Sequence, residues 1–237
     1  AVSAINTINS LISVDLDAMA PRPNVNGKGS HGGYCGPAVK PIALNFVAAI
    51  SSDPELRGLP ISGIGGISNW KDAAEFLALG CSNVQVCTVV MHYGFRIVED
   101  MIDGLQNWMA SKGYQRLTDF QGLAIPSLQK WENLDLNHFI RAHIDHDKCI
   151  GCELCFIACE DGAHQALELV QKDGKRKVDV KEDMCVGCNL CSLICPVPGC
   201  ITMQHVENGA PAVSWRQFSA GAGKLADRPQ HYLPIEE

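Results

Sequence analysis

The stretch CIGCELCFIAC, residues 149–159, carries four cysteines in the spacing C-x2-C-x2-C-x3-C. The same spacing returns 36 residues later as CVGCNLCSLIC, residues 185–195, and a proline follows it. At that offset Gly151 matches Gly187 and Leu154 matches Leu190, so the two stretches form an internal repeat. These two stretches hold eight of the 12 cysteines and decide the fold class of the second half of the chain.

The spacing is typical of iron–sulfur ligation. Three thiolates two residues apart can bind three irons of a [4Fe–4S] cubane, and the fourth cysteine binds the neighbouring cluster. We therefore expect two clusters with crossed ligands, the first on Cys149, Cys152, Cys155 and Cys195 and the second on Cys185, Cys188, Cys191 and Cys159. A pair of zinc sites is the alternative, but zinc needs no third evenly spaced cysteine.

The repeat resembles bacterial-type ferredoxins with two [4Fe–4S] clusters, except that Glu160 replaces the proline usual at that place. Two alternating segments, 166–170 and 177–180, flank a turn signal and predict a hairpin between the motifs. We expect an α+β ferredoxin-like domain over residues 147–205, with Cys200 as a small buried residue rather than a ligand.

Composition excludes several other classes. The 237 residues are 46% hydrophobic and 19% charged, an ordinary globular balance. A net charge of −7 provides no basic surface for nucleic acid, and the apolar runs are too short to span a membrane. The cysteines are clustered in metal-ligand spacing instead of being dispersed as a disulfide scaffold, which favours a cytoplasmic location.

The first half alternates strands with helices. Strand patterns at 2–5, 60–67 and 84–88 are each followed by a helical pattern, at 37–51, 69–79 and 95–112. Such alternation predicts a parallel sheet. The pair Gly65-Gly66 follows a strand but lacks the G-x-G-x-x-G spacing of a dinucleotide fold, which favours a (β/α)8 barrel. A plain tight turn is the other interpretation of this pair.

Several short motifs carry a more specific resemblance: AINT at 4–7, VNGK at 25–28, GGYCGPAVKPIAL at 32–44, IGG at 64–66 and QVCT at 85–88. Together they are similar to the C-terminal part of the dihydroorotate dehydrogenase-like FMN barrel. With two ferredoxin motifs downstream, the chain resembles the dihydropyrimidine dehydrogenases, especially the bacterial NAD-dependent FMN/iron–sulfur type. We accordingly expect part of an α/β TIM barrel over 1–112, a connector over 113–146 and an extended tail over 206–237.

The resemblance implies roles for individual residues. Asn6 and Thr7 stand where the family contacts its pyrimidine substrate, although an Asx-type turn would explain this pair as well. The positions that correspond to FMN contacts are Gly36, Ile64, Gly65, Gly66, Cys87 and Thr88. The family's proton-donating cysteine and flavin-pairing lysine belong to a part outside this sequence, so no catalytic residue is assigned here.

Only about three of eight βα units are present, so the rest of the barrel must lie in a missing N-terminal portion or another chain. The resemblance implies a hetero-oligomer in which an NADH- and FAD-binding subunit donates electrons. They would cross the two clusters to FMN and reduce uracil or thymine at C6. A ferredoxin-type carrier whose barrel remnant only docks a partner is the alternative, and a relative acting on another cyclic substrate is a third possibility. For His138, His143 and His146 we expect solvated surface positions rather than a metal site.

Overall fold

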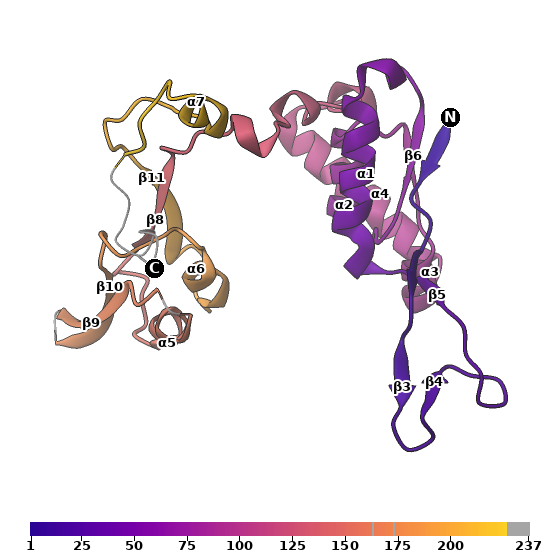
Figure 1. Cartoon of the computed structure of the whole chain (residues 1–237), viewed down its shortest axis with the longest axis horizontal. Helices are drawn as coiled ribbons and strands as arrows, with labels where there is room; N and C mark the ends of the chain where they lie inside the picture. Colours follow the sequence, from indigo (N-terminus) through magenta and orange to yellow (C-terminus); the bar gives the residue numbers. More distant parts are fainter. Residues whose placement is uncertain (163, 173, 227–237) are drawn as a thin grey trace. The chain divides into compact units, whose positions relative to one another are not determined.

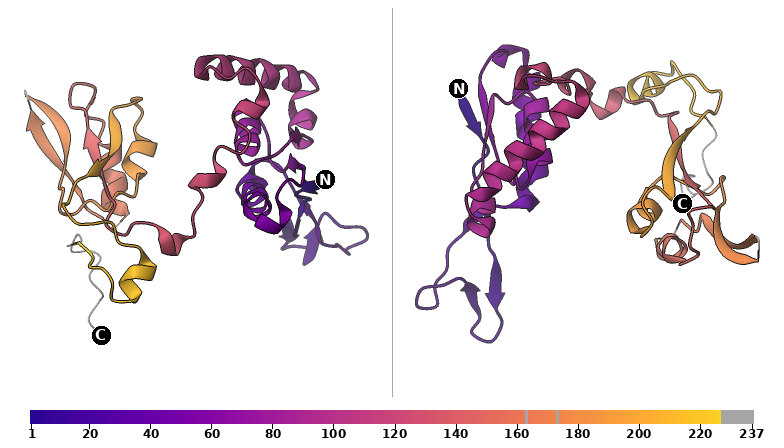
Figure 2. Two further views of the ribbon diagram at one scale, coloured as in Figure 1. Left: turned by 90° about the horizontal axis from the view of Figure 1, so that it is seen from above. Right: turned by 180° about the vertical axis from the view of Figure 1, so that it is seen from behind.

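In the computed structural model, which describes residues 1–162, 164–172 and 174–226, the first strands pair in parallel as their pattern predicts. The chain divides into two units, Ala1–Leu128 and Gln129–Glu237 (Figure 1). The sheet of the first unit has the order β1-β6-β7, with β1 at Val2–Ala4, β6 at Ile61–Ile64 and β7 at Asn83–Gln85. Its helices are α1 at Lys40–Ser52, α2 at Trp70–Ala78, α3 at Thr88–Tyr93 and α4 at Arg96–Lys112 (Figure 2).

The third strand is shorter than the pattern at 84–88 predicts. It ends at Gln85, and Thr88 already begins α3. As a result, only Val86 and Cys87 separate β7 from α3. The first helix also differs, because Pro37–Val39 forms a 3-10 turn before α1 starts at Lys40.

The helices bury one face of the sheet. Ala4, Gly63 and Val84 lie in register across the three strands and alternate with Ser3 and Ser62. A Cβ atom at Gly63 would lie 2.6 Å from the ring of fully buried Phe76, so the glycine lets α2 approach the sheet closely. Because successive side chains of a strand point to opposite faces, the serines lie on the face away from these helices.

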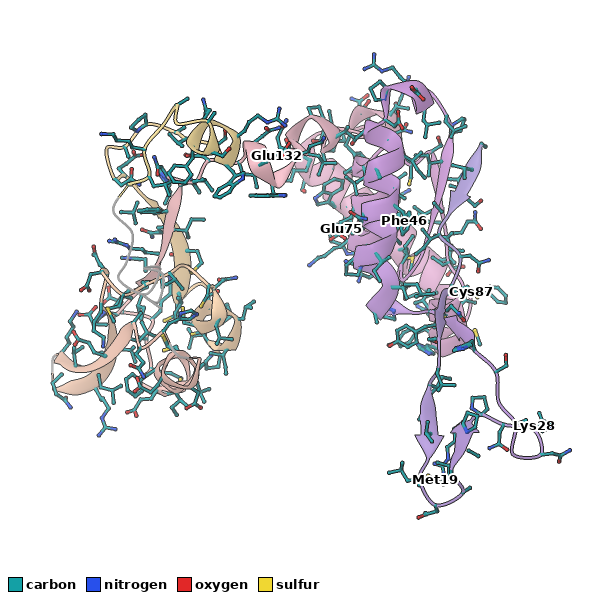
Figure 3. All side chains as sticks on the ribbon, in the orientation of Figure 1. Met19, Lys28, Phe46, Glu75, Cys87 and Glu132 are labelled. Atoms are coloured by element: carbon teal, nitrogen blue, oxygen red, sulfur yellow. The ribbon has the colours of Figure 1, made fainter. Side chains whose placement is uncertain are left out.

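Two small antiparallel pairs interrupt the βα pattern between β1 and α1. Strand β2 at Ile8–Ser10 pairs with β5 at Gly32–Tyr34, and β3 at Ser13–Asp15 pairs with β4 at Ala20–Arg22. Figure 3 shows Met19 at the tip of the second pair and Lys28 in the following loop. This excursion extends from the carboxyl end of β1, beside the end of the sheet where the other strands lead into their loops.

The second unit shows the internal repeat in three dimensions. One copy is β8 at Phe139–Ile144, α5 at Leu154–Asp161 and β9 at Leu167–Lys172. The other is β10 at Lys175–Val180, α6 at Leu190–Ile194 and β11 at Ile201–Val206. Strand β8 pairs antiparallel with β11 and β9 with β10, so each copy completes its pairing with the other. The expected hairpin between the motifs is β9–β10.

The unit boundary falls inside the stretch 113–146 that was expected to be a connector. Phe120 is buried against α2 and α4 in the first unit, whereas β8 belongs to the second. In the region expected to be an extended tail, α7 forms at Trp215–Ser219, and residues 227–237 lie outside the described part. Buried Asn137 ties this region down, since its Nδ2 donates to the carbonyl oxygens of Pro211 and Lys224. No helix in the described part of the chain combines the length and apolar character needed to cross a bilayer.

Candidate functional site

A pocket of about 420 Å³ opens at the carboxyl ends of β1, β6 and β7. Parallel α/β sheets bind their ligands at this end. Its lining includes every residue that the sequence assigned to substrate or flavin: Asn6, Thr7, Gly36, Ile64, Gly65, Gly66, Cys87 and Thr88. The structure therefore brings together positions spread over more than 80 residues of sequence.

The glycine pair of this pocket has a packing role that the sequence did not reveal. Gly65 and Gly66 have φ angles of 136° and 74°, which side chains rarely adopt. A Cβ atom at Gly66 would lie 2.7 Å from the carbonyl oxygen of Gly36 and 2.8 Å from the backbone nitrogen of Lys40. The loop after β6 thus packs directly on the turn that leads into α1, and both form the wall of the pocket.

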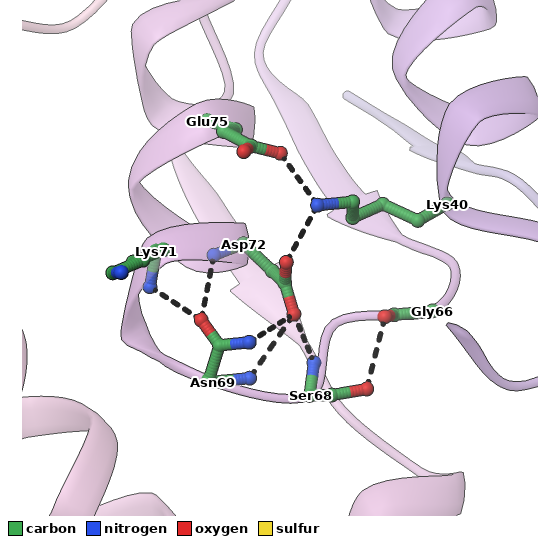
Figure 4. Close-up of polar contacts among 7 residues, drawn as sticks. All are labelled: Lys40, Gly66, Ser68, Asn69, Lys71, Asp72 and Glu75. Atoms are coloured by element: carbon green, nitrogen blue, oxygen red, sulfur yellow. Dashed lines mark hydrogen bonds and ion pairs between the residues drawn. The ribbon is translucent and has the colours of Figure 1, made fainter. Parts of the chain in front are cut away.

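A carboxylate holds the other end of the same loop (Figure 4). Oδ2 of Asp72 accepts hydrogen bonds from the backbone N–H groups of Ser68 and Asn69, at 2.8 and 3.2 Å. The Asn69 side chain in turn accepts from the N–H of Asp72, which completes a capping box. Ser68 Oγ donates to the carbonyl oxygen of Gly66, so the cap extends into the glycine turn.

Lys40 joins this cap to α1. Its ammonium lies 2.6 Å from Oδ1 of Asp72 and 2.9 Å from Oε2 of Glu75, and these two hydrogen bonds raise the pKa of Lys40. Lys40 was not among the predicted site residues, because it meets Asp72 only across 32 residues of sequence. It holds the two segments that form the pocket wall against each other.

The pair predicted to contact substrate lies exposed at the end of β1. The Thr7 N–H donates to Oδ1 of Asn6 at 2.7 Å. This bond joins adjacent residues, so it differs from the Asx-type turn considered as the alternative, in which the side chain bonds the N–H two residues on. This bond uses one lone pair of the Asn6 carbonyl oxygen and leaves further hydrogen-bonding capacity on the amide and on the Thr7 hydroxyl. This local bond and a contact with a ligand are therefore compatible.

The sequence assigned no role to three further side chains that line this pocket, those of Ser3, Gln85 and Cys35. Gln85 Nε2 donates to the hydroxyl oxygens of Ser3 and Ser62, at 3.1 and 2.7 Å, and so connects all three strands. Ser3 and Gln85 line the pocket themselves. Thr88 Oγ1 lies 3.4 Å from Sγ of Cys35, another lining residue. Alternation along the strands was the signal that could have identified the first two.

The pocket fits a flavin phosphate in its donor chemistry. Among the residues that the structure describes, no hydrogen bond uses the N–H groups of Gly66 or Ile67. Successive free backbone N–H groups in a glycine turn form a concavity that binds anions. Ligand pockets of this size combine apolar walls with a few such polar groups.

The eight repeat cysteines gather in the second unit in two sets. One small pocket is lined by Cys149, Cys152, Cys155 and Cys195, and another by Cys159, Cys185, Cys188 and Cys191. Both cysteine loops turn through a glycine with φ near 70°, Gly151 in the first and Gly187 in the second. Each set of four thus draws its last member from the other copy of the repeat.

These sets fit iron–sulfur clusters in donor type, since thiolate sulfur is the ligand of such clusters. Burial raises the pKa of Cys155 and of Cys191 to about 11, so metal binding would release their protons. In the described part of the chain, no three His, Cys, Asp or Glu side chains are close enough together to hold a single metal ion.

The remaining candidates lie elsewhere. Cys200 is buried beside the first cysteine set, and its Sγ lies 3.6 Å from the carbonyl oxygen of Asp145. His138 stacks on His205, His143 is exposed, and half-buried His146 has its Nε2 3.5 Å from Asp179. None of these histidines lines a cysteine pocket.

Comparisons with known proteins agree with the two units. Residues 1–109 match the dihydroorotate dehydrogenase family, and residues 142–203 match the 4Fe-4S dicluster domain. Over 171 residues the chain is 49% identical to the NAD-dependent dihydropyrimidine dehydrogenase subunit PreA of Escherichia coli K12, covering 72% of this chain and 42% of that protein. It is 40% identical over 124 residues to the catalytic subunit of dihydroorotate dehydrogenase B (NAD(+)) of Pyrococcus abyssi, covering 52% and 39%.

A third relative is the chloroplastic dihydropyrimidine dehydrogenase (NADP(+)) of Arabidopsis thaliana, 40% identical over 126 residues, 51% of this chain and 29% of that protein. The chain thus spans less than half the length of these relatives. The expected resemblance is confirmed, and the two matched families support FMN and 4Fe-4S clusters as cofactors. The chain is thus homologous to the dihydropyrimidine dehydrogenase subunit PreA over the matched residues, with a segment similar to the dihydroorotate dehydrogenase family before a segment similar to the 4Fe-4S dicluster domain.

Proposed function

We propose that the chain is the C-terminal portion of an oxidoreductase subunit that uses NADH-derived electrons to reduce uracil or thymine to the 5,6-dihydropyrimidine. The observation that carries this proposal is the single pocket at the carboxyl ends of three parallel strands, which collects all eight positions expected to bind substrate and FMN. A purely structural turn at the glycine pair would not require these positions to converge.

In this proposal the pocket wall binds FMN. The N–H groups of Gly66 and Ile67 face its phosphate, while Gly36, Ile64, Cys87 and Thr88 contact the rest of the cofactor. FMN supplies the exchange between single electrons and a hydride. The chain orients the cofactor, because Asp72 and Lys40 hold the loop between β6 and α2 in one conformation before the cofactor binds.

Asn6 and Thr7 are proposed to orient the pyrimidine. An amide and a hydroxyl offer both donors and acceptors, which suits the alternating carbonyl and N–H groups of a cyclic imide. Their exposure at the pocket mouth leaves them accessible to a ligand. The proton delivered to C5 comes from outside this chain.

The cysteines are proposed to bind two [4Fe–4S] clusters in crossed sets, and the chain to work in the cytoplasm within a hetero-oligomer. The partner is a subunit that binds NADH and FAD and donates electrons to the clusters. The rest of the barrel is supplied by an N-terminal portion or another chain. The two pockets that each collect four thiols support this ligation.

Anaerobic purification of the subunit that contains this chain, followed by iron, sulfide and flavin analysis, tests the proposal. We expect about eight irons from two cubanes and one FMN, together with NADH-dependent loss of uracil when the electron-donor subunit is added. Iron without flavin would instead support a ferredoxin-type carrier, and zinc without visible absorption would refute the cluster assignment.

A further inference from the structure

The two cysteine loops lie in equivalent places in the second unit. A Cβ atom at Gly151 would lie 2.5 Å from the carbonyl oxygen of Arg176 on β10, and one at Gly187 would lie 2.3 Å from that of Ile140 on β8. Residues 176 and 140 are 36 positions apart, as are the two loops. The next residue along each strand is therefore also equivalent, and it is Lys177 beside the first loop and Arg141 beside the second.

These two cations make different contacts. The Lys177 ammonium donates to the carbonyl oxygen of Cys149, the first cysteine of its loop, and at 2.8 Å to that of His146. Arg141 instead directs Nη1 to Oε2 of Glu182 at 3.1 Å. Among the described residues Lys177 has no carboxylate partner within 4 Å. Its charge is therefore held against the first loop without neutralisation, whereas that of Arg141 is paired.

Other charges near the loops do not cancel this difference. Beside the first loop, Glu153 is paired with Arg176 at 2.6 Å, and Asp145 with Lys148 at 2.7 Å. Asp147 is exposed to solvent, which screens its charge.

Within the part of the chain that the structure describes, no cation is hydrogen-bonded to the backbone of the second loop. Glu160 and Asp161 follow Cys159, but both are exposed, so solvent screens their charges as it does that of Asp147. The backbone carbonyl of Lys181 accepts from the N–H of Cys185. Among the described contacts, however, the side chain of Lys181 donates no hydrogen bond to this loop.

We infer that the two cluster sites are electrostatically unequal, and that Lys177 makes the cluster on Cys149, Cys152, Cys155 and Cys195 the first to be reduced. This inference rests on the proposed pair of [4Fe–4S] clusters and adds the order in which they are reduced. Reduction adds one negative charge to a cluster, and a nearby partly buried cation stabilises that charge. An electron that enters the second unit therefore resides on the first cluster. Lys177 stabilises the negative charge there without binding the cluster itself.

Redox titration with dithionite, followed by electron paramagnetic resonance on the anaerobically purified chain, tests the order. Cys152→Ser and Cys188→Ser, each changing an exposed cysteine of one set, assign the two signals. In the unmodified chain we expect the signal altered by Cys152→Ser to develop at the higher potential. Lys177→Met should lower the ratio of reduced to oxidised cluster at a fixed potential by the order of tenfold, which corresponds to about 59 mV for a one-electron couple. The reduction potential of the other cluster should hardly change.

Lys175→Met is the matched control, because it removes the same charge from an exposed position two residues along the same strand, and it should leave both potentials unchanged. Lys177→Arg retains the charge and should preserve the order. If the Lys177→Met variant cannot hold iron, the order in which the two assigned signals develop in the unmodified chain still decides whether the inference holds. Earlier reduction of the signal altered by Cys188→Ser overturns the inference while leaving the proposed function intact. A chain with a single cluster overturns both.

Discussion

Lys40 and Asp72, 32 residues apart in the sequence, meet through an ion pair of 2.6 Å that fixes the loop between β6 and α2. The side chain of Asp72 is only 9% exposed, and that of Lys40 25%. A carboxylate this buried depends on its partner, since removing one member leaves a charge that water cannot fully solvate. The pair therefore contributes both to the stability of the first unit and to the shape of the pocket wall.

Lys40→Met tests this pair. We expect the free energy of unfolding to fall by about 1–3 kcal/mol, because the Asp72 carboxylate loses a hydrogen-bonded partner. FMN should also bind more weakly, as the loop is less constrained. Urea unfolding and flavin titration of the subunit measure the two effects. Lys28→Met is the control at an exposed position and should change neither.

The same pair has a defined dependence on pH. The pKa of Lys40 is raised above 10.5 in the folded chain by its hydrogen bonds to Asp72 and Glu75. The stabilisation is thus fully present below pH 10.5 and is lost as the pH rises through the raised value. Urea midpoints measured from pH 8 to 11 should fall more steeply at the alkaline end for the unmodified chain than for Lys40→Met, and parallel curves would contradict the assignment.

Gly66→Ala is expected to damage both folding and flavin binding of the first unit. The positive φ alone costs an ordinary residue about 1–3 kcal/mol, and the added Cβ atom meets backbone atoms of Gly36 and Lys40. Gly113→Ala is the matched control, with a φ of 77° and nothing within 4 Å of the added atom. The midpoint temperature of thermal unfolding should be lowered more by Gly66→Ala than by Gly113→Ala. Iron content should be retained in both variants, because the cysteines belong to the other unit.

Cys159→Ala is expected to remove the cluster on Cys185, Cys188 and Cys191 and to spare the one whose loop is adjacent in sequence. Iron should fall to about four per chain, half of the eight expected for two cubanes. Cys200→Ala serves as the comparison, since Cys200 lines the first pocket but is not a proposed ligand, and it should keep all the iron. Loss of the spectroscopic signal assigned to the first set in Cys159→Ala would refute the crossed arrangement.

Thiol labelling offers a test of the flavin pocket that needs no turnover. Cys35 and Cys87 are exposed and line the pocket, whereas Cys81 is fully buried and burial raises its pKa to about 11. Iodoacetamide at pH 8 should therefore modify the first two and spare Cys81, because the thiolate is the reactive form. Added FMN should protect Cys35 and Cys87. Peptide mass spectrometry reads the sites, and labelling of all three at equal rates would contradict the pocket geometry.

Local patterns predicted much of the fold, and contacts between distant segments account for the rest. The capping box of Asn69 and Asp72 and the hairpin β9–β10 follow from neighbouring residues, so their sequence signals are sufficient. Lys40 has no local signal, because its partners lie on another helix. The packing role of Gly66 is equally invisible in sequence, since the atoms that exclude a side chain belong to the turn before α1.

The start of the second unit is a comparable case. Strand β8 lies 36 residues before β10, so the repeat itself extends back to Phe139, inside the stretch expected to be a connector. The two strands have the sequences FIRAHI and KRKVDV, which have no identical residue at equivalent positions. A search for the repeat by residue identity therefore ends at the cysteine loops.

The exchange of strands and cysteines between the two copies determines when each site can be completed during synthesis. Hairpin β9–β10 joins neighbouring residues, but β8 cannot pair until Ile201–Val206 of β11 has left the ribosome. On the proposed ligation, Cys149, Cys152 and Cys155 likewise wait for Cys195. Cluster loading of either site is therefore a late event that reports on nearly the whole unit, and a chain that stops before Cys195 has no complete first site to load.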